Sequence, residues 1–197
     1  MTQQQIERIS KRISDIKGTL AAEKRKYGGY DDGRGLRYLP TKYFIQLGDY
    51  TGGLAYTKWF DKTFPDDRGF PDFLFEWTII LFKSSKIKEA EKKAFQTFCS
   101  NTYLFDKYFG EPIIPVDKWE GSNLEIPSFA EKFAYSSAQP ALADFSEWLK
   151  SLISAKDFLN RTNKFIAIHK RLKTEGDPEA RYFLVRQACQ LEQSKGA

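Results

Sequence analysis

The sequence predicts an all-α protein made of stacked antiparallel helices, and two observations support this fold class. Residues of one helix face recur every three or four positions over much of the chain, as at Tyr50, Leu54, Thr57 and Phe60, which is the period of an α-helix. A turn followed by such a helix occurs at Gly48 and again 37 residues later, at Ser85. A turn and helix that recur every roughly 30 to 40 residues are typical of helical repeat arrays. We therefore expect about seven to nine helices in a right-handed array.

The composition and the charge distribution limit the class of protein. Hydrophobic residues make up 41% of the 197 residues and aromatic residues 16%, which is enough for a packed core and argues against wholesale disorder. The net charge of +5 is uneven: residues 1–40 carry nine Lys or Arg against five Asp or Glu, residues 41–155 carry thirteen against sixteen, and residues 156–197 carry nine against five. We interpret the basic ends as solvated helix faces, and a nucleic-acid-binding patch is the alternative.

Three features of the sequence favour a cytoplasmic location. No apolar run approaches the ~20 residues that are needed to cross a bilayer. The N-terminal segment lacks the apolar core of a secretory signal. The two cysteines, Cys99 and Cys189, form no CxxC pair and predict no disulfide framework, which fits a reducing compartment. We expect a cytoplasmic protein that does not associate with membranes.

Residues 1–27 are expected to form an amphipathic helix with one narrow apolar seam. The residues of the seam are Ile6, Ile9, Ile13, Ile16 and Leu20. The seam spans about two heptads, whereas a self-standing coiled coil needs three or four. We therefore expect this helix to cap the repeat array, and a homodimer through the same seam is the alternative.

Residues 34–109 are expected to form two helix pairs after a break that contains Asp31 and Asp32, which we interpret as turn and cap residues. Pro40 predicts either a helix start near Arg37 or a local bend, because proline is tolerated only in the first turn. Gly53 is costly in the middle of a helix, so we expect it to face the preceding helix where the two backbones approach closely.

A strongly apolar segment, residues 73–83, is expected to form a buried helix within the second pair. Its apolar residues cover nearly every face, and it is too short to span a membrane. A strand is the alternative, because the segment contains adjacent isoleucines and several aromatic residues.

The C-terminal half is expected to begin with an irregular loop and to continue with helices. Residues 110–128 contain three prolines, two glycines and a tryptophan, which indicates an ordered irregular loop. Loops of this length are often functional, and a structural strap across the array is the alternative. Residues 129–193 are expected to be helical, with a break at Gln139-Pro140 and a last helix capped by Asp177. The residues that this last helix is expected to bury are Tyr182, Val185, Ala188 and Leu191.

The residues from Gly48 to Pro65 resemble the second helix of a tetratricopeptide repeat. In that helix a G-x-Y start, here Gly48-Asp49-Tyr50, is followed by a small residue, here Gly53, and by a closing proline. Ser85-Lys86-Ile87, with Ala90 and Ala94, looks like the same element in a second copy, and the resemblance covers residues 34–103. It implies stacked helix pairs with a concave groove that binds a peptide or a partner protein, without catalysis.

The resemblance also places a partner-binding groove on the first helix of each pair. The residues that it assigns to the groove are Tyr38, Lys42 and Gln46 in the first pair and Asp72, Phe75, Ile79 and Lys83 in the second. For Phe75 and Ile79 the alternative is a place in the core, because their helix is so apolar.

The sequence shows no arrangement typical of an enzyme. The single histidine, His169, has no cysteine or histidine nearby, and we expect a surface or boundary residue there rather than a catalytic base. No phosphate-binding glycine loop, nucleophile elbow or zinc spacing occurs. We therefore predict a non-catalytic protein-interaction scaffold with no cofactor and no metal ion. A basic helical protein that associates with nucleic acid is the alternative.

Overall fold

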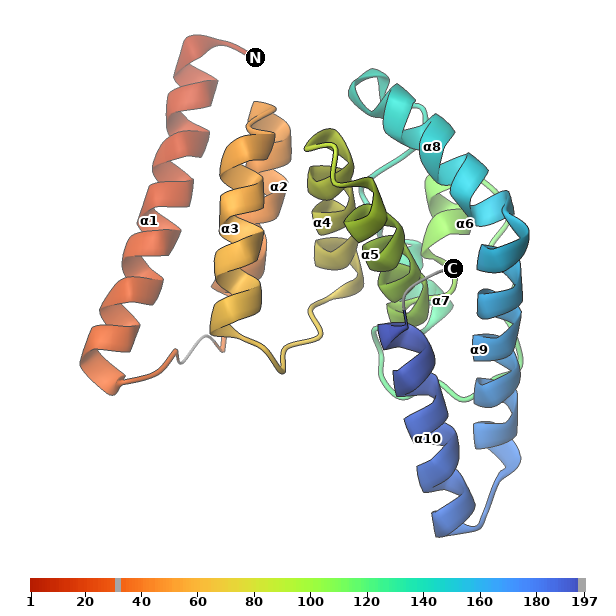
Figure 1. Cartoon of the computed structure of the whole chain (residues 1–197). Coiled ribbons are helices and arrows are strands. Elements are labelled where there is room, and N and C mark those ends of the chain that lie inside the picture. The colour runs from red at the N-terminus through yellow and green to blue at the C-terminus, as the bar shows by residue number, and fades with distance from the viewer. Residues whose placement is uncertain (31–32, 195–197) are drawn as a thin grey trace. The chain divides into compact units, whose positions relative to one another are not determined.

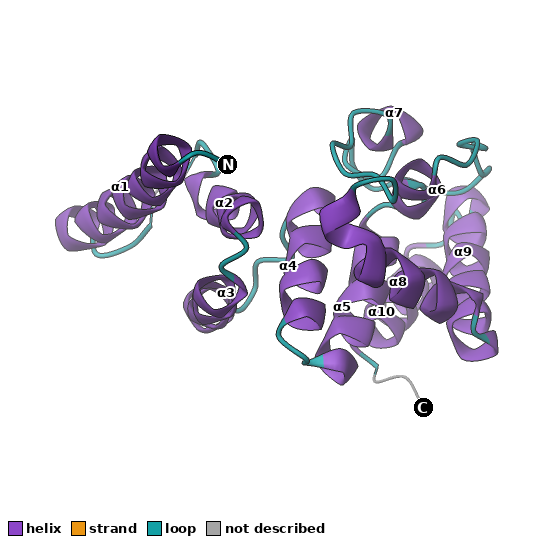
Figure 2. Ribbon diagram, turned by 90° about the horizontal axis from the view of Figure 1, so that it is seen from above, coloured by secondary structure: helices purple, strands orange, loops and turns teal. Residues whose placement is uncertain are grey.

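The computed structural model describes residues 1–30 and 33–194, and this part of the chain consists of helices joined by loops (Figures 1 and 2). It contains ten α-helices and two short 3₁₀ helices and no strand, so the predicted all-α class is confirmed there. Asp31 and Asp32 lie outside the described residues. The chain divides into two compact units, Met1–Lys86 and Ile87–Ala197. Each unit is described by itself.

The first unit consists of four α-helices that alternate in direction along the chain (Figure 1). Their bounds are α1 Gln3–Tyr27, α2 Leu39–Leu47, α3 Tyr50–Thr63 and α4 Pro71–Lys83, with a 3₁₀ turn over Leu36–Tyr38 before α2. Helix α1 packs on α2, and α2 packs in turn on α3 and α4. Helix α3 also packs on α4.

Helix α1 begins with a capping box in which the Thr2 hydroxyl accepts a hydrogen bond from the Gln5 backbone N–H and the Gln5 side chain accepts one from the Thr2 backbone. Its apolar seam faces the unit, because Ile13 and Leu20 are buried. Ile13 forms a core cluster with Phe44 and Tyr56. The predicted N-terminal helix is therefore confirmed, and it covers one end of this unit.

Helices α2 and α3 follow local signals in the sequence. Pro40 lies in the first turn of α2, so the first of its two expected placements is correct. The Asp49 carboxylate caps α3 by accepting a hydrogen bond from the Gly52 N–H. A Cβ atom on Gly53 would lie 3.2 Å from the Phe44 Cβ and 3.0 Å from the Ile80 Cδ1. Gly53 thus faces the preceding helix, as predicted.

Helix α4 is confirmed as a buried helix, and the strand alternative is wrong. Every residue from Phe73 to Leu81 is buried. One of them is charged: Glu76 accepts a hydrogen bond of 2.6 Å from the Thr41 hydroxyl of α2. A buried carboxylate needs such partners, because an unpaired one would lose its hydration without compensation.

The turns at Gly48 and Ser85 have the same geometry. The Asp49 N–H donates to the Phe44 carbonyl and the Lys86 N–H donates to the Leu81 carbonyl, each spanning five residues. Gly48 has φ 69° and Ser85 has φ 58°, which is the left-handed conformation of a Schellman motif. The helices that follow, α3 and Ile87–Ser100, each have 14 residues. The two turns, 37 residues apart in the sequence, therefore share one backbone geometry.

Ser85 is the only non-glycine residue with positive φ among the described residues, so Ser85→Gly is expected to stabilise the protein. The left-handed conformation costs a side-chain-bearing residue roughly 1–2 kcal/mol, and Ser85→Gly removes this cost. The greater conformational freedom of glycine in the unfolded chain offsets part of the resulting gain in stability. We expect a net gain of about 0.5–1 kcal/mol in urea unfolding. Ser84→Gly is the matched control, because Ser84 has φ −93° and should lose stability. Equal losses in both variants would contradict the assignment of strain to Ser85.

The second unit contains six α-helices and a long irregular segment. The bounds are α5 Ile87–Ser100, α6 Leu104–Phe109, α7 Pro127–Ala130, α8 Ala143–Ser154, α9 Lys156–Thr174 and α10 Pro178–Gln193, with a 3₁₀ turn over Pro140–Leu142. Helices α9 and α10 lie side by side as a hairpin (Figure 1). The Asp177 carboxylate caps α10 as predicted, by accepting a hydrogen bond from the Ala180 N–H. The short helices α6 and α7 were not predicted.

Two predictions for this unit are wrong. The helix expected from residue 129 is only the single turn of α7, and residues 131–139 are not helical. Gln139 is held in an extended conformation by the proline that follows it, and the Ser137 N–H bonds to the Tyr108 carbonyl rather than within a helix.

No helix among the described residues is both long enough and apolar enough to cross a membrane.

The second error concerns the buried face of α10. Leu184 and Ala188 are buried there, whereas Tyr182 is 58% exposed and Val185 is 40% exposed. Leu191 is half-buried. The apolar residues of α10 occur on more than one face, and the neighbouring helix decides which face it covers.

Candidate functional site

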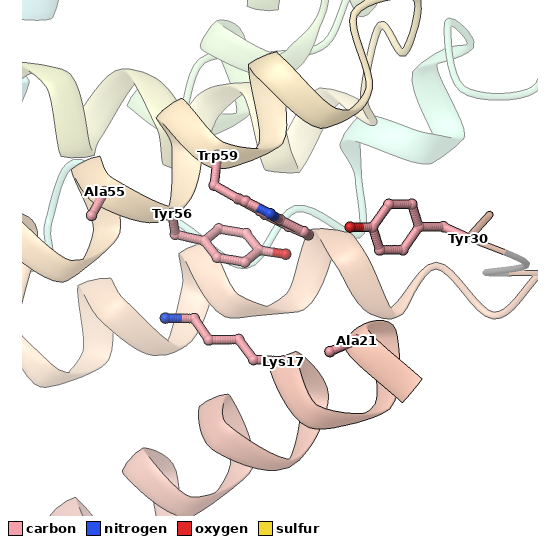
Figure 3. Close-up of a pocket in the computed structure, with 6 residues that line it drawn as sticks. All are labelled: Lys17, Ala21, Tyr30, Ala55, Tyr56 and Trp59. Carbon is pink, nitrogen blue, oxygen red and sulfur yellow. The ribbon is translucent and has the colours of Figure 1, made fainter. Parts of the chain in front are cut away.

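A pocket in the first unit lies between α1 and α3 and has a volume of about 320 Å³ (Figure 3). Its lining residues are Lys17 and Ala21 from α1, Tyr30 from the segment after α1, and Ala55, Tyr56 and Trp59 from α3. Lys17 and Ala21 are four positions apart in α1, and Trp59 lies four positions after Ala55 and three after Tyr56 in α3, so each helix presents one face to the pocket. The two alanines leave the space that larger side chains would fill.

Three aromatic rings form the walls of the pocket. The Tyr56 and Trp59 rings lie 5.2 Å apart at 40°, and the Tyr30 ring meets the Trp59 ring at 6.0 Å and 84°. The Tyr30 ring also packs against the Phe64 ring, with the two ring centres 4.9 Å apart. Figure 3 shows the Tyr30 hydroxyl directed toward Trp59. Tyr56 is buried and the other two rings are half-buried, which gives an apolar floor with an accessible rim.

The polar groups of the pocket are only partly used by the protein. The Tyr56 hydroxyl donates a 2.7 Å hydrogen bond to the Arg37 carbonyl, which fixes that ring. Within the described part of the chain, no residue pairs with the Tyr30 hydroxyl, with the Trp59 indole N–H or, as an ion pair, with the Lys17 ammonium. Among the described residues, these groups therefore have no partner that would compete with a ligand.

The positive charges around the pocket come from α1. The Lys17 Nζ lies 5.8 Å from the Tyr56 ring centre and 5.2 Å from that of Phe44. The Lys24 Nζ lies 5.2 Å from the Tyr30 ring centre. Of the described lining residues, one is a cation and none is a carboxylate. Glu23 of the same helix does not line the pocket, and one of its carboxylate oxygens is buried without a hydrogen-bond partner among the described residues.

Tyr38, the first residue of the predicted groove, takes part in a hydrogen-bond network with Asp67 in the loop between α3 and α4. Its hydroxyl donates a 2.7 Å hydrogen bond to the Asp67 carboxylate, and the Arg37 Nε donates to the same oxygen at 2.8 Å. Burial, reinforced by Asp67, raises the pKa of Tyr38 to about 12. The Asp67 carboxylate also accepts the Gly69 N–H, so this network holds the turn before α4.

The other predicted groove residues divide into an exposed and a buried set. Lys42 and Gln46 of α2 are exposed, and Lys42 lies near enough to the exposed Asp72 for their charges to interact. The Lys83 ammonium lies over the Tyr50 ring. Phe75 and Ile79 are fully buried, which fits the core alternative for these two residues and removes them from any open surface.

The irregular strap in the second unit is anchored through His169, which is buried rather than at the surface as expected. The Trp119 N–H donates to the His169 carbonyl at 2.9 Å, and the His169 Nδ1 lies 3.1 Å from the Trp119 carbonyl. Because a carbonyl only accepts, Nδ1 carries the proton. Burial lowers the pKa of His169 and the charge of Lys118 adds to this, while the Trp119 hydrogen bond and Glu125 oppose it. His169 is therefore neutral near pH 7 and serves as an anchor.

Further polar residues fasten the same strap. The Asn101 amide donates to the Leu124 carbonyl at 2.7 Å, and the Val116 N–H donates to the Tyr103 hydroxyl at 3.1 Å. Lys118 is buried and pairs with Glu120 at 3.3 Å. These side chains bond to the strap itself, so their arrangement is structural. No group of three metal-ligating side chains occurs among the described residues.

The α1–α3 pocket was not predicted from the sequence. Lys17, Tyr30 and Trp59 are separated by up to 42 positions, and no local pattern links them. No protein-family model, curated protein or solved structure matches this chain. The site must therefore be interpreted from its own geometry.

Proposed function

We propose that this chain is a non-catalytic binding protein of the tetratricopeptide-like kind, and that the α1–α3 pocket receives a side chain of a partner protein. The single observation that carries the proposal is the pocket itself, with its aromatic walls and its free hydrogen-bonding and charged groups. A volume of about 320 Å³ is at the lower end of the range for ligand pockets, which is roughly 300–1,000 Å³. A single anchoring side chain fits this size better than a large cofactor.

The repeat interpretation supports the proposal at the level of architecture. The turns at Gly48 and Ser85 share one geometry at a spacing of 37 residues, and the helices after them are equal in length. Scaffolds of this kind bind partners through the surfaces of their helices. Lys42 and Gln46 remain candidates for further contacts with the partner, since both are exposed on α2.

Filling the pocket tests this function. Ala21→Leu places a larger side chain in the pocket, whereas Ala22→Leu makes the same change at the adjacent exposed position of α1, which does not line the pocket. A partner would be identified by affinity capture and mass spectrometry, and its binding to the purified variants measured by calorimetry. We expect Ala21→Leu to weaken binding about tenfold or more and Ala22→Leu to leave it unchanged, with equal melting temperatures.

Other outcomes of this experiment would redirect the proposal. If both variants bind the partner as tightly as the original protein does, the pocket is not the binding site. If Lys42→Glu weakens binding while Ala21→Leu does not, the predicted groove is the site instead.

Nucleic-acid binding is the second candidate, and the charge of α1 is the observation that favours it. This helix carries seven Lys or Arg against three Asp or Glu. Binding driven by such charges falls steeply as salt is raised, because counterions are released from the phosphates. Titration of labelled single-stranded and duplex oligonucleotides at low and high salt measures this, and an absence of binding at low salt excludes the candidate.

A further inference from the structure

Resting on the proposed function, we infer that the α1–α3 pocket recognises an aromatic side chain flanked by carboxylates, as in an acidic segment of a partner protein. Three aromatic walls alone would also suit a cation, because ammonium groups bind to ring faces. The charges that already surround the rings decide between these two classes of ligand.

Two of the three pocket rings, Tyr56 and Tyr30, already have an ammonium group of the chain over them, whereas among the described residues no cation lies over Trp59. Lys17 lies within 6 Å of the Tyr56 and Phe44 ring centres, and Lys24 lies 5.2 Å from that of Tyr30. A cationic ligand would have to displace these lysines or lie beside them, where like charges repel. An anionic ligand gains from the same two charges.

The free donors of the pocket agree with this choice. Lys17 makes no ion pair with a carboxylate of the described residues, and the Trp59 indole nitrogen is a donor that cannot accept. A carboxylate supplies acceptors for both groups. The aromatic floor then favours an aromatic ring beside that carboxylate, since offset and edge-to-face ring pairs add to simple apolar burial.

The charge of α1 extends this complementarity beyond the pocket. This helix carries an excess of four positive charges along its length, and one of its lysines, Lys17, lines the pocket. Acidic residues on both sides of the aromatic residue would therefore meet a favourable field along the helix, which also raises the rate of association. The occupant inferred here is thus a short acidic peptide segment with one aromatic anchor.

The test uses the full chain and three capped synthetic peptides, acetyl-EDFDE-amide, acetyl-EDADE-amide and acetyl-KKFKK-amide. Binding is followed by the indole N–H signal of Trp59 in ¹⁵N-labelled protein, which Trp59→Phe identifies. We expect EDFDE to shift this signal in a saturable way, and EDADE and KKFKK to bind at least about tenfold more weakly.

A pair of lysine variants tests the local contact. Lys17→Met keeps the apolar stem and removes the ammonium from the pocket, while Lys11→Met removes the same charge from an exposed position of α1 that does not line it. Lys17→Met should weaken EDFDE by roughly three- to tenfold, and Lys11→Met by less than about twofold. Equal losses in the two variants would mean that only the overall charge of α1 attracts the peptide, and would overturn the inference.

Two further outcomes separate the inference from the proposed function. If KKFKK shifts the Trp59 signal more strongly than EDFDE does, the pocket takes a cation, with Glu23 as the candidate counter-charge. The inference then fails while partner binding in the pocket stands. If no peptide shifts the Trp59 signal and Ala21→Leu leaves partner binding intact, both the inference and the proposed pocket function fail.

Discussion

Gly53→Leu is expected to lower the free energy of unfolding by about 2 kcal/mol or more, the first of two large effects. Any Cβ at this position meets the Phe44 Cβ at 3.2 Å and the Ile80 side chain at 3.0 Å, and leucine adds three further carbon atoms. Overpacking of a core costs roughly 1–3 kcal/mol. This cost can exceed the gain of roughly 1 kcal/mol in helix propensity that comes from replacing a glycine inside a helix. Urea unfolding of the full chain measures the difference.

Two control variants separate the effect of close helix packing at Gly53 from the effects of replacing a helical glycine and of adding a leucine. Gly18→Leu makes the same change in α1, where no atom lies within 4 Å of the added Cβ, and it should stabilise the helix by a few tenths to about 1 kcal/mol. Lys62→Leu adds a leucine to an exposed position of α3 and should change stability by less than about 0.5 kcal/mol. Equal midpoints for Gly53→Leu and Lys62→Leu would show that α3 does not pack closely at Gly53.

Leu20→Ala is expected to destabilise the protein by roughly 2–5 kcal/mol, the second large effect. Leu20 is 1% exposed in the seam by which α1 covers the first unit, and truncation there leaves a cavity as well as lost burial. Leu159→Ala in α9 is the matched control, because Leu159 is 47% exposed and the same truncation should cost less than about 0.5 kcal/mol. Thermal and urea unfolding measure both variants.

The same variant distinguishes a cap from a dimer contact. If the seam serves mainly to pair two chains, Leu20→Ala should lower the molar mass in light scattering and leave the unfolding midpoint of the monomer unchanged. The burial of Ile13 and Leu20 within one chain supports the opposite result, a loss of stability at constant mass.

Sequence patterns predicted most of the helices because their signals are local. The Thr2, Asp49 and Asp177 caps and the first-turn prolines each depend on neighbouring residues alone, and each determines where a helix begins. The close approach at Gly53 was also predictable, because glycine destabilises the interior of a helix and is favoured there only where close packing requires it. Residues 131–139 do not form the expected helix, and there the Ser137 N–H bonds to the Tyr108 carbonyl of α6, a contact that no local pattern contains.

The candidate site was less predictable than the helices. The predicted groove depended on a resemblance, and the structure buries Phe75 and Ile79 and engages Tyr38 with Asp67. The pocket instead combines Lys17, Tyr30 and Trp59, whose proximity requires knowing how α1 and α3 pass each other.

The sequence by itself determined the all-α class, the positions of the long helices and the repeated turn at Gly48 and Ser85, because hydrogen bonds and periodicity within a helix involve residues a few positions apart. Only the tertiary structure decided which face of α10 is covered, that His169 is buried, and that a pocket lies between α1 and α3. Burial is a property of the surroundings, and a helix with apolar residues on several faces can be covered on any of them. For the same reason sequence patterns could not predict the proposed binding site, because its lining residues come from segments far apart in the chain.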